Sequence, residues 1–210
     1  MTIWGIVVAA GSGSRFGGPK HDVLLAGRPL WAWAQDALVA GGIGDVVLVG
    51  DVPRGVPGGE RRRDSVAAGL AQIPDDVDYT LVHDAARPLA SPDLVRRVIA
   101  RLRGGDVDAV VPAIPVRDTI KQVNEGRVVA TVDRSVLAAV QTPQGFRTEV
   151  LRSAHQASDG DATDDAALVE DVGGTVATVA GDPRNLKVTY PEDLILAEAL
   201  AAAAADAEPS

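Results

Sequence analysis

The chain has 210 residues, of which 46% are hydrophobic and only 3% aromatic, so its core must be built from aliphatic side chains. This length suits one sizeable core and, most simply, a single α/β domain. A formal net charge of -9 argues against nucleic acids and anionic membranes as partners, so an anionic substrate would need a local cluster of cations. The absence of cysteine excludes disulfides, thiolate catalysis and cysteine-bound zinc.

The first predicted strand is followed by a glycine-rich loop. Residues 3–8 (IWGIVV) form an apolar, β-branched run that is typical of a buried parallel strand. Gly11 and Gly13 follow it and let backbone N–H groups approach a ligand closely, as binding of a polyphosphate requires. Arg15 and Lys20 add positive charge to the same loop. The loop therefore predicts a nucleoside triphosphate site, with a plain strand-to-helix turn as the alternative for the glycines alone.

Two other glycine-loop patterns do not fit this segment. A dinucleotide-binding fingerprint needs glycine where Phe16 stands. The separation of Gly13 and Gly18 matches a Walker loop, but Pro19 precedes the lysine and His21 replaces the Ser or Thr that would hold magnesium. The loop is therefore neither a dinucleotide-binding fingerprint nor a Walker loop.

Strand-like and helix-like segments then alternate along the chain. Further strands are predicted at 46–49, 79–83, 109–113 and 176–180, and helices at 29–39, 64–71, 93–103, 163–172 and 191–205. This order predicts an α/β fold with a doubly wound, mostly parallel sheet, Rossmann-like, that binds ligands at the carboxyl ends of its strands. The loops 10–20, 50–65 and 83–88 each follow a predicted strand, so we expect them to cluster at that edge.

Residues 114–140 depart from this alternation. They contain two alternating stretches around Asn124-Glu125-Gly126, which is a hairpin signal. So small a hairpin cannot bury its own apolar face. We therefore expect residues 114–137 to form a β-arm that a second copy of the chain covers in a homodimer, with a hairpin folded back on its own domain as the alternative.

The ends of the chain carry few signals. We expect residues 1–205 to form a single domain and the acidic segment 206–210 to be a disordered tail. Met1 leads directly into a strand-like segment without a secretory leader pattern, and no apolar run is long enough to span a bilayer. A cytoplasmic protein is therefore expected.

Eight motifs in a fixed order give the chain a specific family resemblance. They are AAGSGSR (9–15) with PK (19–20), GGERRRDSVAAGL (58–70), VHDAARP (82–88), RDTIK (117–121), DR (133–134), QTPQGF (141–146), TDDA (163–166), and NLKVT with PEDL (185–194). Together they resemble the 2-C-methyl-D-erythritol 4-phosphate cytidylyltransferases of the non-mevalonate isoprenoid pathway. The ribitol-5-phosphate cytidylyltransferases share much of the pattern and are the nearest competitor.

The resemblance implies transfer of CMP from CTP to a phosphate monoester, with release of pyrophosphate. The attacking phosphate oxygen is already ionised at neutral pH, so the reaction needs no general base. The site has instead to hold two polyanions in line and neutralise the charge that develops on the α-phosphate. Arg15 and Lys20 match the family's residues for stabilising the transition state. Magnesium or another divalent cation is the implied cofactor, with Asp84 as its candidate ligand.

The resemblance also carries over two sets of binding residues. The implied CTP-binding residues are Ala9, Ala10, Gly11, Gly13, Gly59, Glu60, Ser65 and Asp84. The implied residues for the polyol phosphate are Asp84, Arg87, Thr119, Arg134, Thr163 and Lys187. Because Thr119 and Arg134 lie on the predicted arm, the resemblance implies that they complete the site of the neighbouring subunit.

Three positions depart from the family pattern. Glu60 stands where Asp is common, which should matter little if its backbone contacts the base. His21 replaces the usual Gln, and Arg184 stands where an acidic residue is often found, which leaves the acceptor open between methylerythritol and ribitol phosphates. A non-catalytic nucleotide-binding protein is the alternative function, but it would need no cations for a second substrate such as Arg134 and Lys187.

For some of these residues a purely structural role is the alternative. Gly58 and Gly59 could form only a turn, and Ser65 could simply begin a helix. His83 is expected to pack at a strand end rather than to bind a ligand.

Overall fold

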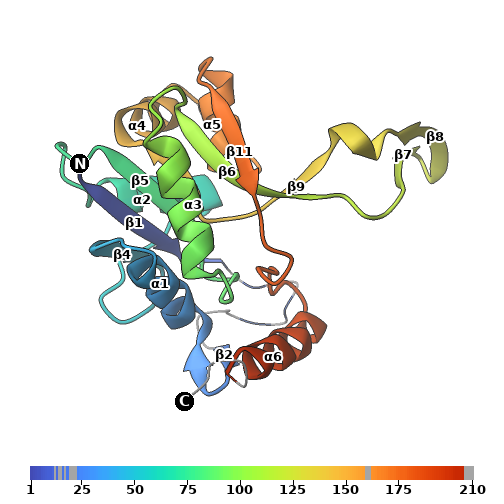
Figure 1. Ribbon diagram of the computed structural model, residues 1–210, viewed down its shortest axis with the longest axis horizontal. Coiled ribbons are helices and arrows are strands. Elements are labelled where there is room, and N and C mark those ends of the chain that lie inside the picture. The colour runs from blue at the N-terminus through green and yellow to red at the C-terminus, as the bar shows by residue number, and fades with distance from the viewer. Residues whose placement is uncertain (12, 14–15, 17, 19–22, 159–161, 206–210) are drawn as a thin grey trace.

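The protein forms a layered α/β fold around one central sheet (Figure 1). The computed structural model describes residues 1–11, 13, 16, 18, 23–158 and 162–205. In this part of the chain, a seven-stranded sheet has the order β11-β6-β10-β5-β1-β4, and β9 pairs with β6 outside that path. Its strands are β1 (Ile3–Val8), β4 (Asp45–Val49), β5 (Tyr79–Asp84), β6 (Ala109–Pro115), β9 (Ala138–Val140), β10 (Gln144–Arg147) and β11 (Val176–Ala180).

The sheet is mostly parallel, as predicted, with antiparallel pairing at β10 and β9. In the register of the three strands nearest the predicted nucleotide loop, Val8 at the end of β1 stands opposite both Val49 of β4 and Asp84 of β5. The carboxyl ends of these strands therefore meet at one level. The loops that follow them emerge at the same edge of the sheet.

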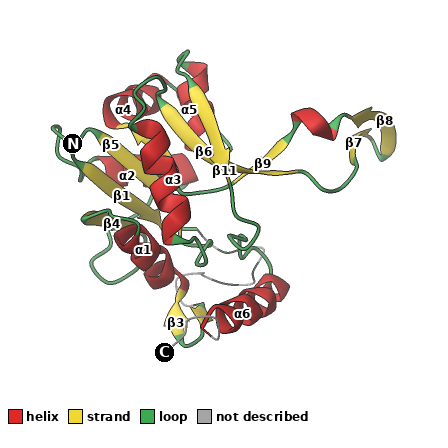
Figure 2. Ribbon diagram, viewed as in Figure 1, coloured by secondary structure: helices red, strands yellow, loops and turns green. Residues whose placement is uncertain are grey.

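Helices cover both faces of the sheet, which confirms the doubly wound prediction (Figure 2). They are α1 (Leu30–Ala40), α2 (Arg62–Leu70), α3 (Pro92–Leu102), α4 (Thr148–Ala157), α5 (Asp165–Asp171) and α6 (Pro191–Ala205). Sequence signals explain the start of α3, since Pro92 is its first residue and Ser91 Oγ accepts a hydrogen bond from Leu94 N at 3.2 Å. Among the described helices, none has both the length and the apolar character that crossing a membrane requires.

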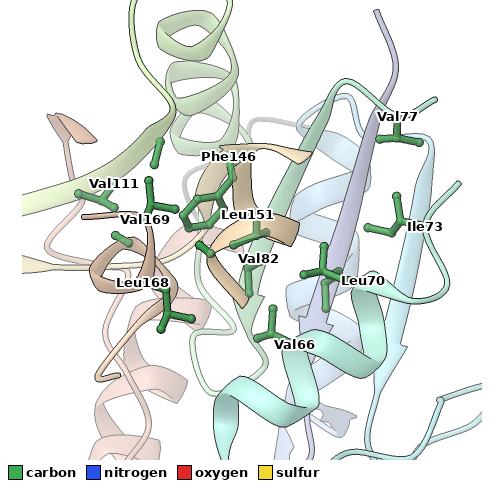
Figure 3. Packing of buried hydrophobic residues seen from close by; sticks show 14 of the residues in the cluster. Val66, Leu70, Ile73, Val77, Val82, Val111, Phe146, Leu151, Leu168 and Val169 are labelled. Carbon is green, nitrogen blue, oxygen red and sulfur yellow. The ribbon is translucent and has the colours of Figure 1, made fainter. Parts of the chain in front are cut away.

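Two apolar clusters fill the space between the sheet and its helices. Successive strand residues point to opposite faces, so Ile6 and Val82 belong to the cluster under α2, α4 and α5, while Val7 and Leu81 belong to the cluster under α1 and α3. Figure 3 shows the first cluster, in which Phe146 lies among aliphatic side chains. The core is mainly aliphatic, as the composition requires. Because residues of β1 and β5 pack in both clusters, this packing holds in place the strands whose carboxyl ends carry the site.

A hairpin extends from the body as the sequence predicted, and it lies far from the other strands (Figure 1). It consists of β7 (Ile120–Asn124) and β8 (Arg127–Val132), and β6 and β9 carry it. Glu125 and Gly126 have φ values of 46° and 76°, and positive φ at both central residues is what a two-residue turn between twisted strands requires. Val123 and Val128 are 56% and 61% exposed, so the described chain leaves the apolar face of the hairpin uncovered.

A smaller third cluster joins the C-terminal helix to the segment before α1. Two short strands, β2 (Leu24–Leu25) and β3 (Arg28–Pro29), pair with each other, and α6 packs against them through buried residues such as Ala197. The sequence did not predict these two-residue strands because each is too short to show an alternating pattern. Val188 also lies in this cluster, which holds the segment before α6 beside the edge of the sheet that carries the site.

Candidate functional site

A pocket of about 510 Å³ opens at the carboxyl edge of β1 and β5. Its volume lies in the range typical of small-molecule sites. Its described lining combines the predicted glycine loop, the start of α2, the end of β5 and one residue from the C-terminal segment. The lining residues are Val8, Ala9, Ala10, Gly11, Gly13, Leu30, Trp31, Gly59, Glu60, Arg61, Arg62, Ser65, Asp84, Ala85, Ala86 and Lys187.

All eight residues predicted to bind CTP line this pocket, together with Lys187 from the predicted acceptor set. The prediction that the three loops cluster is confirmed for their described residues. Arg15, Lys20 and His21 lie outside the described residues, so their predicted roles stay predictions. Their neighbours Gly11 and Gly13 line the pocket.

Close approach of the backbone requires glycine at the start of the α2 loop. A Cβ on Gly58 would lie 2.2 Å from the Ala10 Cβ, and a Cβ on Gly59 would lie 2.3 Å from the Asp64 Cβ. Both distances are shorter than any real contact between carbons. The glycine pair is therefore more than a turn, because it lets this loop pack directly against the end of β1.

Ser65 holds this loop from within the first turn of α2. Its buried hydroxyl accepts a hydrogen bond from Gly59 N at 3.1 Å and donates to Arg61 O at 3.2 Å. Ser65 is not the residue that begins the helix. That role falls to Arg61, whose backbone N–H donates to the Asp64 carboxylate at 3.1 Å, so α2 begins two residues earlier than predicted.

Asp84 is the buried carboxylate of the pocket, and two cations bracket it. Its Oδ1 accepts from Arg62 Nε at 3.1 Å, and its Oδ2 accepts from Lys187 Nζ at 2.7 Å. Arg62 also donates through Nη1 to Asp165 Oδ2 at 2.6 Å. The result is an alternating row of charges, Lys187–Asp84–Arg62–Asp165, that joins four segments of the chain.

The charges of this row support one another. Burial opposes ionisation of the Asp84 carboxyl, but the Arg62, Lys187 and Arg87 cations outweigh it and hold the pKa of Asp84 well below its usual range. Burial likewise opposes the charge on Arg62, and the two carboxylates beside it raise the pKa of Arg62 above its ordinary value. Asp84 is therefore a stable carboxylate, held between two cations at the pocket.

Arg87 lies behind the pocket rather than in its lining. Its guanidinium donates to the backbone oxygens of Asn185 at 2.8 Å and Val140 at 3.2 Å. It thereby links the C-terminal segment to the base of the arm, and burial lowers the pKa of its guanidinium. Contact between Arg87 and a substrate phosphate stays a prediction.

His83 has the packing role that the sequence analysis expected. Burial lowers its pKa to about 4, so the ring is neutral at pH 7. Its Nδ1 lies 2.8 Å from Thr142 Oγ1, and the same hydroxyl oxygen accepts from Asp84 N at 3.0 Å. His83 and Thr142 therefore support the end of β5 from below and do not face the pocket.

Three predicted acceptor residues are not brought to the pocket of their own chain. Thr119 and Arg134 are exposed residues of the projecting arm, where Arg134 donates to Arg117 O. Thr163 is exposed just before α5, beside Asp164, which caps that helix by accepting from Ala167 N at 3.0 Å. These positions leave their predicted roles untested.

The sequence analysis missed Arg62 and Asp165 as members of the site. Arg62 is the middle residue of three consecutive arginines, and their partners differ. Arg61 pairs with Asp64, and Arg63 Nη2 donates to His155 O at 2.9 Å. Since α2 begins at Arg62, the rotation of the helix decides which arginine reaches Asp84. The sequence alone does not single out Arg62, because its neighbours on both sides are also arginines.

The described residues do not form a metal site by themselves. No group of three His, Asp or Glu side chains gathers there in a way that could hold an ion. Asp84 has one partner on each oxygen, and a carboxylate has about four lone-pair sites in all, so it could still contact a cation. A magnesium ion therefore fits here as the companion of bound phosphates, because Mg²⁺ is commonly held by one or two carboxylates together with substrate phosphates.

The fold and this pocket define an α/β nucleotidyltransferase. A glycine-lined loop lies at the carboxyl edge of a doubly wound sheet, and Arg62 and Lys187 reach the same pocket. The described lining contains no histidine, and its serine, Ser65, is hydrogen-bonded within the α2 loop. Comparison with known proteins specifies the family, since the fold alone would not. The family model described as 2-C-methyl-D-erythritol 4-phosphate cytidylyltransferase matches residues 3–202, and the chain belongs to that family.

Relatives and solved structures agree with this assignment. The chain is similar to the 2-C-methyl-D-erythritol 4-phosphate cytidylyltransferases of Rhodococcus jostii (strain RHA1), at 48% identity, and of Nocardia farcinica (strain IFM 10152), at 49%. These alignments cover 93% of this chain and 93% and 92% of the two relatives. The crystal structure of the Thermus thermophilus enzyme superposes with a TM-score of 0.80 at 36% identity, over 94% of this chain and 98% of that one.

Proposed function

We propose that this protein transfers CMP from CTP to 2-C-methyl-D-erythritol 4-phosphate and releases pyrophosphate. The observation that carries the proposal is the position of Lys187 and Arg62 on either side of Asp84, inside a glycine-lined pocket of a family member. Such a site offers positive charge and backbone N–H groups to two anionic substrates. The reaction needs no nucleophile from the protein, because the acceptor phosphate attacks directly.

In this proposal the CTP base lies against the loop that starts α2. Gly59 and Glu60 present their backbones there, and Ser65 holds the loop in shape through Gly59. The tight packing of the loop at Gly58 and Gly59 leaves it little room to move aside, which favours a pyrimidine over a larger purine. The triphosphate then lies along Gly11 and Gly13, which belong to the same sequence motif as Arg15 and Lys20.

The chemistry that remains for the protein is alignment and charge neutralisation. Lys187 is 40% exposed beside the pocket, so its ammonium group can contact the acceptor phosphate while Asp84 fixes its direction. Arg15 and Lys20 act on the charge that builds on the α-phosphate during the attack. A magnesium ion bound with the nucleotide would supply additional neutralisation of the phosphates, with Asp84 as its candidate protein ligand.

The arm supplies the part of the acceptor site that the body lacks. Its exposed valines need cover, and it carries Thr119 and Arg134, neither of which lines the pocket of its own chain. In the proposed homodimer, the arm crosses to the neighbouring subunit and brings Arg134 to that subunit's acceptor phosphate.

Pyrophosphate release tests the proposal directly. CTP, UTP, ATP and GTP are each combined with 2-C-methyl-D-erythritol 4-phosphate and with ribitol 5-phosphate, with magnesium and then with excess chelator. We expect rapid release only for CTP with the methylerythritol substrate, and loss of activity in chelator. Comparable turnover with ATP or GTP, or a preference for ribitol 5-phosphate, would contradict the proposed specificity. Full activity in chelator would contradict the metal.

A further inference from the structure

The row of charges at the pocket continues beyond Arg62 into the helical layer behind it. Asp165, the first residue of α5, accepts from Arg62 Nη1 on one carboxylate oxygen. On the other oxygen, Oδ1, it lies 3.1 Å from His155 Nε2 of α4. The connected groups therefore run from His155 through Asp165, Arg62 and Asp84 to Lys187.

Burial makes the inner end of this row dependent on its own partners. The Asp165 residue is 0% exposed and His155 is 9% exposed, so little water reaches either group. A buried carboxylate that loses a hydrogen-bond partner is left with an uncompensated desolvation penalty, which is larger for a charged group than for a neutral one. The two hydrogen bonds of Asp165 thus fix the position of its carboxylate, and this carboxylate in turn fixes the Arg62 guanidinium.

Chemistry sets the direction of the bond between His155 and Asp165. A carboxylate only accepts hydrogen bonds, so His155 Nε2 carries the proton and donates it. Its Nδ1 is buried and has no hydrogen-bond partner among the described residues, so a proton there would be an unpaired buried donor. The two cations and two carboxylates of the row, Lys187, Asp84, Arg62 and Asp165, balance in charge.

No charged group from another described element takes the place of Asp165 as the partner of the His155 ring. Arg63 of α2 approaches it through the backbone oxygen of His155 and not through the ring. Asp64 pairs with Arg61 at 2.9 Å and lies 3.9 Å from Arg63 Nε. The ring of His155 therefore has Asp165 as its polar contact within the described chain, and Arg62 connects that pair to the pocket.

We infer that His155 and Asp165 are positioning residues, which act through Arg62 to hold the Asp84–Lys187 pair in its reactive place. The inference rests on the proposed function, because the aligned group is the cation that meets the acceptor phosphate. The competing explanation is that the pair only joins α4 to α5. A purely structural contact between α4 and α5 would change the free energy of unfolding. It would leave the mobility of the Arg62 guanidinium and the acceptor kinetics of the folded protein unchanged.

The test compares variants of the full chain in the presence of CTP and magnesium. His155→Leu removes the donor, His155→Gln retains one, and Asp165→Asn leaves a single oxygen that cannot serve both partners. The matched control is Val169→Ala, which removes packing from the same helix as Asp165 without touching a polar group. Hydrogen exchange of the Arg62 Nε–H, assigned by its disappearance in Arg62→Lys, reports on the guanidinium independently of activity.

We expect His155→Leu and Asp165→Asn to accelerate exchange of the Arg62 Nε–H and to lower kcat/KM for the acceptor by about tenfold, the effect of about 1.4 kcal/mol. The double variant, His155→Leu with Asp165→Asn, should have a kcat/KM for the acceptor no lower than that of the more impaired single variant. Both substitutions act through the same Arg62 guanidinium, so their effects should not add. His155→Gln should restore most of both properties. Val169→Ala should change neither, even where its free energy of unfolding falls.

Other results would overturn either the positioning role or the proposed function. If folded His155→Leu keeps both exchange and acceptor kinetics within about twofold of the wild type, the positioning role is wrong. Should His155→Leu fail to fold, Asp165→Asn decides, and unchanged Arg62 exchange in that variant overturns the inference. Absence of CMP transfer by the wild type would instead overturn the proposed function, and the exchange measurement would still decide the positioning role.

Discussion

Lys187 Nζ lies 2.7 Å from Asp84 Oδ2, although 103 residues separate the two in the chain. Neighbouring backbone contacts hold the two segments together. Val188 N donates to Ala86 O at 2.7 Å, and Arg87 Nη1 donates to Asn185 O at 2.8 Å. The pocket is therefore complete only when the segment before α6 has docked on the loop after β5. Local stability of that segment becomes a condition for function.

The first prediction concerns Asp84→Asn and its dependence on pH. At pH 7 the free energy of unfolding should fall by about 1–3 kcal/mol, because Arg62 and Lys187 lose a charged acceptor. The Lys187 side chain is 40% exposed, so water screens its part of this loss. Urea unfolding of both proteins measures the difference.

The pH dependence follows from the direction of the Asp84 shift. Its pKa in the folded protein lies below the unfolded value of about 3.9, so the carboxylate stabilises the fold fully above that pH. The contribution is lost as pH falls through the lower folded-state pKa. The gap between wild type and Asp84→Asn should therefore be constant between about pH 5 and 7 and should narrow toward about pH 2. A gap that widens on acidification would contradict the ion-pair description.

Gly58→Ala tests the close approach of the base loop to β1. The new Cβ would lie 2.2 Å from the Ala10 Cβ and 2.9 Å from Ser65 Oγ, so the loop must shift. We expect KM for CTP to rise about tenfold or more, in keeping with the cost of overpacking. Gly44→Ala is the matched control, because its Cβ would meet open space. Steady-state kinetics that do not separate the two variants would argue against this placement of the base.

Local sequence signals predicted most of the fold. The bounds of β11 and α6 match the prediction. Both bounds of α1 and of α3 differ from the prediction by one residue, and β4 and β5 are each one residue longer than predicted. These elements have clear periodicity or a clear start, such as Ser91-Pro92 before α3. The hairpin turn at Glu125 and Gly126 was equally clear. Where a short segment has a clear periodicity or turn signal, its secondary structure can be predicted without knowledge of its tertiary contacts.

The antiparallel strand β10 (Gln144–Arg147) could not be predicted in this way. Its residues have little β-propensity, and pairing with β5 and β6 on either side makes it a strand. Gly145 fits there because a Cβ would lie 2.5 Å from Leu102 Cδ1 of α3. Both reasons are long-range contacts, which a single sequence does not display.

The residues of the candidate site fall into the same two groups, those predictable from local sequence and those that depend on long-range packing. Backbone-binding residues such as Gly11 and Gly59 follow strands and are recognisable from the motif alone. The partnership of Arg62 with Asp165 depends instead on how α2 and α5 pack, across 103 residues of sequence. Sequence can therefore predict what kind of ligand the pocket takes more readily than which side chains align it.

Lys20→Ala tests the electrostatic role that the family resemblance gives to the glycine loop. A cation aimed at charge that develops during the reaction acts mainly in the transition state. We expect kcat to fall by about 10²–10³-fold while KM for CTP changes little. Arg103→Ala, which removes an exposed cation at the end of α3, is the control for net charge. A Lys20→Ala variant that changed only KM would assign the lysine to ground-state binding.

The last prediction is that each active site is shared between two subunits. Arg134 lies in the turn between β8 and β9 and does not line the pocket of its own chain, and valines of the arm are exposed. If the arm crosses a dimer, Arg134→Ala disables the neighbour's site, whereas Lys20→Ala disables its own. In a heterodimer of the two inactive variants, one site would carry both defects and the other neither. A random mixture should therefore recover about a quarter of wild-type activity once subunits exchange. Size-exclusion chromatography and mixed-tag capture verify the dimer and the exchange. No recovery after demonstrated exchange would mean that the arm serves its own chain.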